Sequence, residues 1–164
     1  MPQLIKDHAL VRDEWVIGGS EVPAGAAKLI LPLAEYLAAI TAGEPAQDRA
    51  VLLKAENLDL TPLLPYLATL PLIAVNFTTT GDGRGYTQAS LLRERYGYKG
   101  ELRAVGKIRV DQVWFMARCG FDSFELLDEE DPQVAIAQLQ RFSVAYQAGA
   151  DGLAHPRRRA GYAS

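Results

Sequence analysis

Four short apolar runs recur from residue 51 onward, and each is followed by a segment with helical spacing. Such alternation of strands with helices implies right-handed crossovers and a parallel sheet. The sequence therefore predicts an α/β fold of successive βα units with a mainly parallel sheet. The spacing fits part of a barrel and an open doubly wound sheet equally well. The runs predicted to be strands are 51–53, 72–77, 101–105 and 123–126.

The segments between these runs carry helix signals. Thr61 and Pro62 suit the cap and the first position of a helix. Thr87 predicts the cap of a helix over 88–96, and Gly97 predicts its end. Apolar residues at offsets of three and four predict a further, deeply buried helix. Its stripe consists of Val110, Val113, Trp114 and Ala117, widened by Phe115 and Met116.

The two ends of the domain are less regular. Asp131 and Pro132 predict the start of a last helix that runs to about Tyr146. Near the N-terminus, residues 14–17 predict a short strand, and the alanine-rich segment 28–40 predicts a helix.

Length and composition indicate one globular domain. The chain has 164 residues, of which 49% are hydrophobic and 23% charged. We assign residues 1–149 to a single α/β domain and 150–164 to a flexible tail. The net charge of −3 disfavours nucleic-acid binding through a basic face. The N-terminus lacks the apolar run of a signal peptide, and no apolar stretch is membrane-length, so we expect a cytoplasmic protein.

The loop after the second predicted strand is the first candidate site. It contains Asp82, Gly83, Arg84 and Gly85 directly before a predicted helix. Glycines allow close backbone approach, and a helix N-terminus with an arginine suits an anion. Arg84 would hold the anion, and Asp82 would be a candidate general acid or base. The alternative is a tight Asp-Gly turn with a salt-bridged arginine.

Polar residues interrupt the predicted strands near their ends. They are Lys54, Asn76, Arg103 and Glu125. Because an unpaired buried charge is costly, these groups must pair, meet solvent or line a site. Arg103 and Glu125 come from strands that are consecutive in sequence. They are candidate binding residues, and a direct structural ion pair between them is the alternative.

A third candidate region lies around the fourth predicted helix. Asp111 and Gln112 precede it, and Arg118 lies about two turns along. Asp111 is a second candidate acid or base, with Gln112 and Arg118 as binding residues. Cys119 is the one cysteine, and both histidines lie near the termini. We therefore expect no Cys-His or Ser-His-Asp mechanism and no metal site.

Four stretches of the chain, at residues 82–93, 100–106, 111–112 and 118–125, are distinctive. They resemble an uncharacterised bacterial domain family, mostly proteobacterial, whose members are commonly encoded beside the sulfite reductase hemoprotein. Members are often labelled oxidoreductases involved in sulfite reduction. The sequence has no nicotinamide or flavin fingerprint and no cysteine set for an iron–sulfur cluster, so we expect no cofactor.

The resemblance implies an accessory role in assimilatory sulfite reduction. The partner would be the sulfite reductase hemoprotein or its electron donor. Two alternatives stay open: a stand-alone enzyme on a small anionic metabolite, and a non-catalytic interaction module. A homodimer is a further possibility, because four βα units leave sheet edges to protect.

Overall fold

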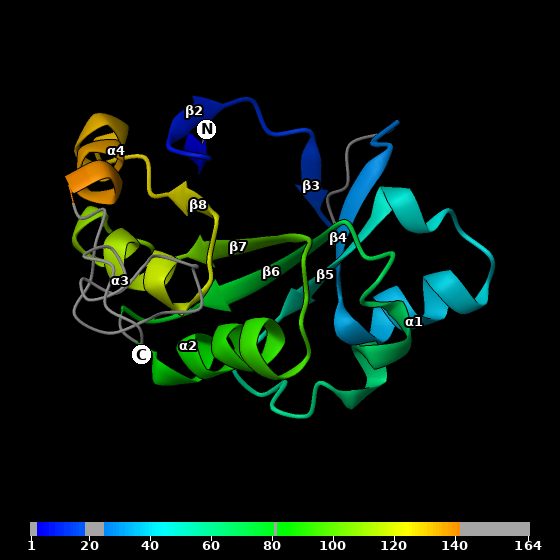
Figure 1. Cartoon of the computed structure of the whole chain (residues 1–164). Coiled ribbons are helices and arrows are strands. Elements are labelled where there is room, and N and C mark those ends of the chain that lie inside the picture. Colours follow the sequence, from blue (N-terminus) through cyan, green and yellow to red (C-terminus); the bar gives the residue numbers. More distant parts are fainter. Residues whose placement is uncertain (1–2, 19–24, 81, 142–164) are drawn as a thin grey trace, which may run out of the picture.

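The computed structural model describes residues 3–18, 25–80 and 82–141. One eight-stranded sheet has the order β2-β1-β8-β7-β6-β5-β4-β3 (Figure 1). Strands β3 to β8 lie side by side in chain order and pair in parallel, whereas β1 pairs antiparallel with both β8 and β2. The strands are β1 Gln3–Lys6, β2 Ala9–Val11, β3 Trp15–Ile17, β4 Lys28–Pro32, β5 Arg49–Leu53, β6 Leu72–Phe77, β7 Glu101–Gly106 and β8 Ser123–Leu126.

The connection between the two edge strands shows that the sheet is curled. Eight strands laid flat would separate β2 from β3 by about 34 Å, at about 4.8 Å per strand. Only residues 12–14 join Val11 to Trp15, and four Cα–Cα steps reach about 15 Å at most. The sheet therefore forms a curled half-barrel, and residues 12–14, which we call the strap, bridge its open side (Figure 1).

The helices all cover the convex side of this half-barrel (Figure 1). Neighbouring parallel strands joined by right-handed crossovers place every connection on the same face. The strand order never reverses, as a doubly wound sheet would require, so the partial-barrel alternative is the one adopted. The helical segments are α1 Leu33–Thr41, η1 Ala46–Asp48, η2 Thr61–Tyr66, α2 Gly83–Ser90, the π-helix η3 Leu91–Arg95, η4 Val110–Gln112, α3 Val113–Cys119 and α4 Pro132–Arg141.

Two apolar clusters stabilise the fold, one on each face of the sheet. The larger cluster lies between the sheet and the helices and includes the fully buried Val51, Ile73 and Val75. The smaller one lies on the concave face, where Trp15 packs against it. Its members alternate along the strands with those of the larger cluster, as a sheet buried on both faces requires. They are Ile30, Ala50, Leu52, Leu72, Ala74 and Val105.

The N-terminal third differs from the sequence prediction. The predicted helix 28–40 is strand β4 followed by α1, because the apolar run 29–31 is buried between β3 and β5. Strands β1 and β2 were not predicted. The predicted strand 14–17 is confirmed as β3. The predicted tail 150–164 and the end of the last predicted helix lie outside the described residues.

Three predicted helices also need correction. Helix α2 begins at Gly83 with Asp82 as its cap, five residues before the predicted helix start. The predicted helix after Thr61 is the six-residue 3₁₀ segment η2, in which Pro65 has no N–H to donate. Helix α3 is not deeply buried, since Phe115 is 53% exposed. Within the described ranges, no helix has the length and apolar character needed to span a bilayer.

Candidate functional site

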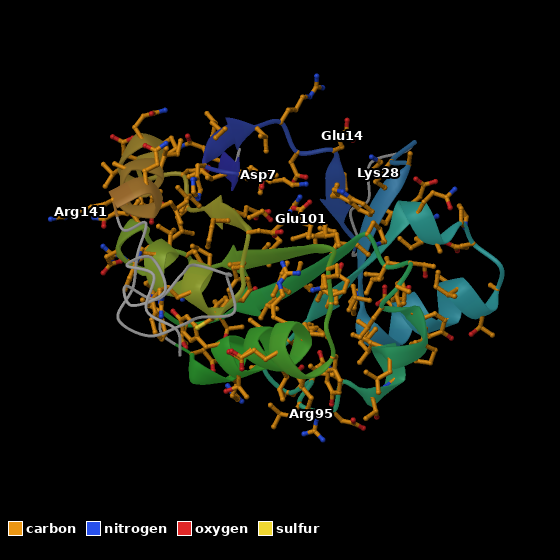
Figure 2. The ribbon with its side chains drawn as sticks, viewed as in Figure 1. Asp7, Glu14, Lys28, Arg95, Glu101 and Arg141 are labelled. Carbon is orange, nitrogen blue, oxygen red and sulfur yellow. The ribbon has the colours of Figure 1, made fainter. Side chains whose placement is uncertain are left out.

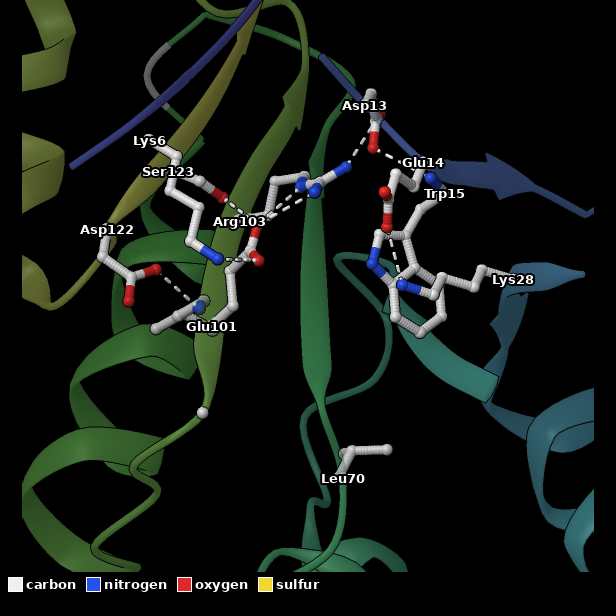
Figure 3. Close-up of polar contacts among 12 residues, drawn as sticks. Lys6, Asp13, Glu14, Trp15, Lys28, Leu70, Glu101, Arg103, Asp122 and Ser123 are labelled. Carbon is white, nitrogen blue, oxygen red and sulfur yellow. Dashed lines mark hydrogen bonds and ion pairs between the residues drawn. The ribbon is translucent and has the colours of Figure 1, made fainter. Parts of the chain in front are cut away.

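Arg103 lies on the concave face of β7 and forms the centre of a charged network (Figure 3). Its side chain is 2% exposed. Nη1 donates to Asp13 Oδ2 in the strap at 2.8 Å, while Nε and Nη2 donate to Glu101 Oε1 at 3.0 and 2.9 Å. The guanidinium thus links the strap to the middle of the sheet. Removing one partner of such a buried ion pair strongly destabilises a fold, because the other charge stays buried without a partner.

Two further groups complete this network from the neighbouring strands. Lys6 Nζ of β1 donates to Glu101 Oε2 at 2.9 Å, and Ser123 Oγ of β8 donates to Glu101 Oε1 at 2.7 Å. Burial alone would raise the pKa of Glu101, but the Lys6 hydrogen bond, the Arg103 charge and the Ser123 hydroxyl outweigh it and lower that pKa. Glu101 lies inside the curl, whereas Arg95 lies on the helix side (Figure 2).

The sequence suggested a direct ion pair between Arg103 and Glu125, and the structure does not form it. The register of β7 and β8 places Arg103 beside Ser123, so Glu125 lies one side-chain position further along the same face. Arg103 instead pairs within its own strand and with the strap. The Glu125 side chain has no hydrogen bond or ion pair among the described residues. Burial, and then the charge of Asp13, raise its pKa, and Arg103 acts in the opposite direction.

The Asp-Gly-Arg-Gly turn follows β6 and starts α2. Asp82 Oδ1 accepts from Arg84 N at 3.1 Å, which caps the helix. The Arg84 guanidinium returns to the same carboxylate, with Nε–Oδ1 and Nη2–Oδ2 distances of 3.1 Å each. Hydrogen bonds from Arg84 lower the pKa of Asp82. Gly83 starts the helix, and a Cβ on Gly85 would lie 2.6 Å from the Phe77 ring. The anion-binding role of this turn stays a prediction.

The third predicted group lies beyond the end of β7. Asp111 is exposed on η4, and Gln112 Oε1 accepts from Arg109 N at 3.4 Å. Arg118 lies at the last turn of α3, with its guanidinium carbon 5.8 Å from the Trp114 ring centroid. Their proposed catalytic and binding roles stay predictions. Among the described residues, no three His, Cys, Asp or Glu side chains are grouped to hold a metal ion.

Two side chains in the stretch 82–93 hold loops in place, and neither was predicted as a site residue. Gln88 is 1% exposed, and its Nε2 donates to the carbonyls of Lys54 and Asn57. Arg93 donates to the carbonyls of Tyr98, Gly100 and Gly120 at 2.8 to 2.9 Å. Both join segments distant in sequence, so no local pattern could reveal these roles.

The stretch 118–125 meets Arg93 at the start of β8. Gly120 has φ +116°, and a Cβ there would lie 2.4 Å from Arg93 Cγ. Asp122 accepts from Leu102 N at 2.8 Å and pairs with Arg93 at 3.3 Å. Burial raises the pKa of Asp122 even though both contacts favour its charged form. Several residues that carry the resemblance therefore have structural roles here.

Comparison with protein families identifies the family of this chain. A family model described as a bacterial protein of unknown function, DUF934, matches residues 50–156. The chain belongs to the DUF934 family. No curated protein matches the sequence. The DUF934 match contains Arg103 and Glu101, whereas their partners Lys6 and Asp13 lie before it.

An exposed aromatic face occurs within the DUF934 region. Phe115 of α3 is 53% exposed, and its ring lies 5.1 Å from that of Tyr86 of α2. Tyr86 also lines an open groove of about 310 Å³ along α2 and η3. We call this surface the α2–α3 face. It comprises Phe115 and the groove residues Tyr86, Thr87, Ser90, Leu91, Glu94 and Arg95.

Proposed function

We propose that this protein is an accessory component of assimilatory sulfite reduction that docks through its α2–α3 face on the sulfite reductase hemoprotein. The observation that carries the proposal is the exposed Phe115 ring, which packs at a tilt against Tyr86 at the edge of the groove. Large aromatic side chains are enriched at the centres of protein interfaces, where they dominate binding energy.

The state of the two arginines favours docking over the anion-metabolizing alternative. Arg84 is engaged by both carboxylate oxygens of Asp82, and Arg103 is engaged by Glu101 and Asp13. An anionic substrate would have to displace a carboxylate from either arginine. Docking through the α2–α3 face requires no such rearrangement.

The identity of the partner rests on the family resemblance. Members of the family that the chain resembles are commonly encoded beside the hemoprotein, which supports a common role in sulfite reduction. The groove ends on Glu94 and Arg95, so its rim offers both signs of charge to a partner. Charged rims around an aromatic centre favour specificity and association rate.

A growth assay tests the proposal in a bacterium that encodes the protein. We expect deletion of the gene to impair growth on sulfate or sulfite and to spare growth on cysteine. Wild type should restore growth, and Phe115→Asp should not. Leu64→Asp is the matched control, because Leu64 is a 41% exposed apolar residue on η2. Equal growth of the deletion strain on all three sulfur sources would contradict the proposal.

A further inference from the structure

Two polar side chains on the concave face stand outside the Arg103 network. Glu125 of β8 and Asn76 of β6 are half-buried, and neither side chain makes a hydrogen bond or ion pair among the described residues. Lys6, Glu101, Arg103 and Ser123, by contrast, are joined to one another. Both side chains are partly exposed, so their polar atoms are accessible to a ligand on this face of the sheet.

The sheet register places these two side chains on either side of Val105. Asn76 pairs with Val105 across β6 and β7. The β7–β8 pairing of Ala104 with Phe124, continued by one residue, places Val105 beside Glu125. The two side chains therefore start about 10 Å apart, two strand spacings, and the curl of the sheet turns them toward each other. Val105, which is 2% exposed, is the apolar residue between the two side chains on the sheet surface. The next residue, Gly106, has no side chain that could fill the space between them.

The position in the fold is the one where such sheets bind ligands. Glu125 and Asn76 are each the next-to-last residue of a parallel strand. In barrels of βα units, ligand sites lie at this carboxyl end of the strands, whereas residues at the amino end serve stability. The Arg103 network begins at Glu101 and Ser123, the first residues of β7 and β8, and so belongs to the stabilising end.

The charge of the surroundings selects the kind of ligand. Asp13, Glu101 and Glu125 bring three negative charges, and Lys6 and Arg103 bring two positive charges. Nε, Nη1 and Nη2 of Arg103 donate hydrogen bonds to Glu101 and Asp13. The Glu125 carboxylate has no direct ion-pair partner among the described residues, and a cation with N–H donors would supply one.

We propose that Glu125 and Asn76 bind the primary ammonium group of a small metabolite above Val105. The Glu125 carboxylate is the counter-ion, and the Asn76 side-chain oxygen accepts a second N–H. This site is independent of the α2–α3 face and of the partner proposed above. A failure of docking would leave it unaffected, and the reverse also holds.

Nuclear magnetic resonance of the intact protein tests the site with n-butylammonium chloride as the probe. With side-chain carboxyl ¹³C labelling, the titration midpoint of Glu125 should move to lower pH as the probe is added. The titration midpoint of Glu101 should not respond, because both of its carboxylate oxygens already accept hydrogen bonds within the protein. Tetramethylammonium chloride at equal ionic strength has no N–H donor and should leave Glu125 unchanged.

Variants make the test decisive. Asn76→Leu should weaken the response of Glu125 to butylammonium, and Glu125→Gln should remove the probe's effect on thermal stability. Thr41→Val, an exposed position at the end of α1, should bind the probe as wild type does. An unmoved Glu125 midpoint, or an equal response to both salts, would overturn the proposal. A response that survives in Asn76→Leu at full strength would remove Asn76 from the site.

Discussion

Arg103 Nη1 donates a 2.8 Å hydrogen bond to Asp13 Oδ2 across ninety residues of sequence, and this contact attaches the strap to the inside of the curled sheet. The same guanidinium bonds Glu101, which Lys6 holds from β1. Strands β1, β7 and β8 and the strap are thereby joined through the buried pair of Arg103 and Glu101. The half-barrel is stabilised from its concave side by this network and from its convex side by the helices.

Removing the central cation should destabilise the protein strongly. We expect Arg103→Met to lower the free energy of unfolding by about 3–5 kcal/mol, because it leaves buried carboxylates with too few partners. Urea denaturation followed by circular dichroism measures the change. Arg84→Met is the control, since the Arg84 side chain is 56% exposed and Asp82 keeps its role as helix cap, and its unfolding midpoint should stay close to that of wild type. Equal midpoints for both variants would contradict the role of Arg103.

The network should make stability depend on acid pH. The pKa of Glu101 is lowered in the folded state, so its contribution is present above its ordinary pKa of 4.5 and is lost as pH falls through the folded value. Wild type should therefore exceed Glu101→Gln in stability at pH 7, and the difference should shrink below pH 4.5. Urea titrations across this range test the sign. A difference that grows toward acid pH would refute the assignment.

The contribution of Glu125 to stability should depend on pH in the opposite direction. Its pKa is raised in the folded state, so the charged form destabilises the fold above that pKa, and the penalty disappears as pH falls through it. We expect Glu125→Gln to be more stable than wild type by about 1 kcal/mol at pH 8 and equally stable at pH 4. Thermal unfolding at both values measures this. A less stable variant at pH 8 would show that Glu125 has a partner in the folded protein.

Gly106 should tolerate no side chain. Its φ is +96°, and a Cβ would lie 2.4 Å from the Phe77 carbonyl oxygen. Gly106→Ala should therefore cost about 2 kcal/mol or more in the free energy of unfolding. Gly83→Ala is the matched control, because nothing lies within 4 Å of its Cβ position, and it should be neutral or slightly stabilising. The comparison fails if both variants unfold at the same urea concentration.

The sequence predicted the strands that begin near 51, 72, 101 and 123, because short runs with apolar residues alternate there with helical segments. It misassigned 28–32, where an apolar run precedes an alanine-rich helix without a break in composition. Tertiary pairing with β3 and β5 decides that segment, and no local signal reports it.

The polar residues near strand ends were expected to pair, meet solvent or line a site, but their partners were not predictable. Arg103 was expected near Glu125, the polar residue of the next strand. Its actual partner Asp13 belongs to a segment whose position depends on β1 and β2, which carry no clear pattern. The roles of Gln88 and Arg93 were hidden for the same reason, since their acceptors are backbone carbonyls of distant loops.

Sedimentation velocity with the purified sulfite reductase hemoprotein tests the proposed function most directly. The haem absorbance allows the hemoprotein to be followed alone as this protein is added. We expect a faster-sedimenting complex with wild type and with Leu64→Asp, and none with Phe115→Asp. Unchanged sedimentation of the hemoprotein with wild type, or an undiminished complex with Phe115→Asp, would contradict docking through the α2–α3 face.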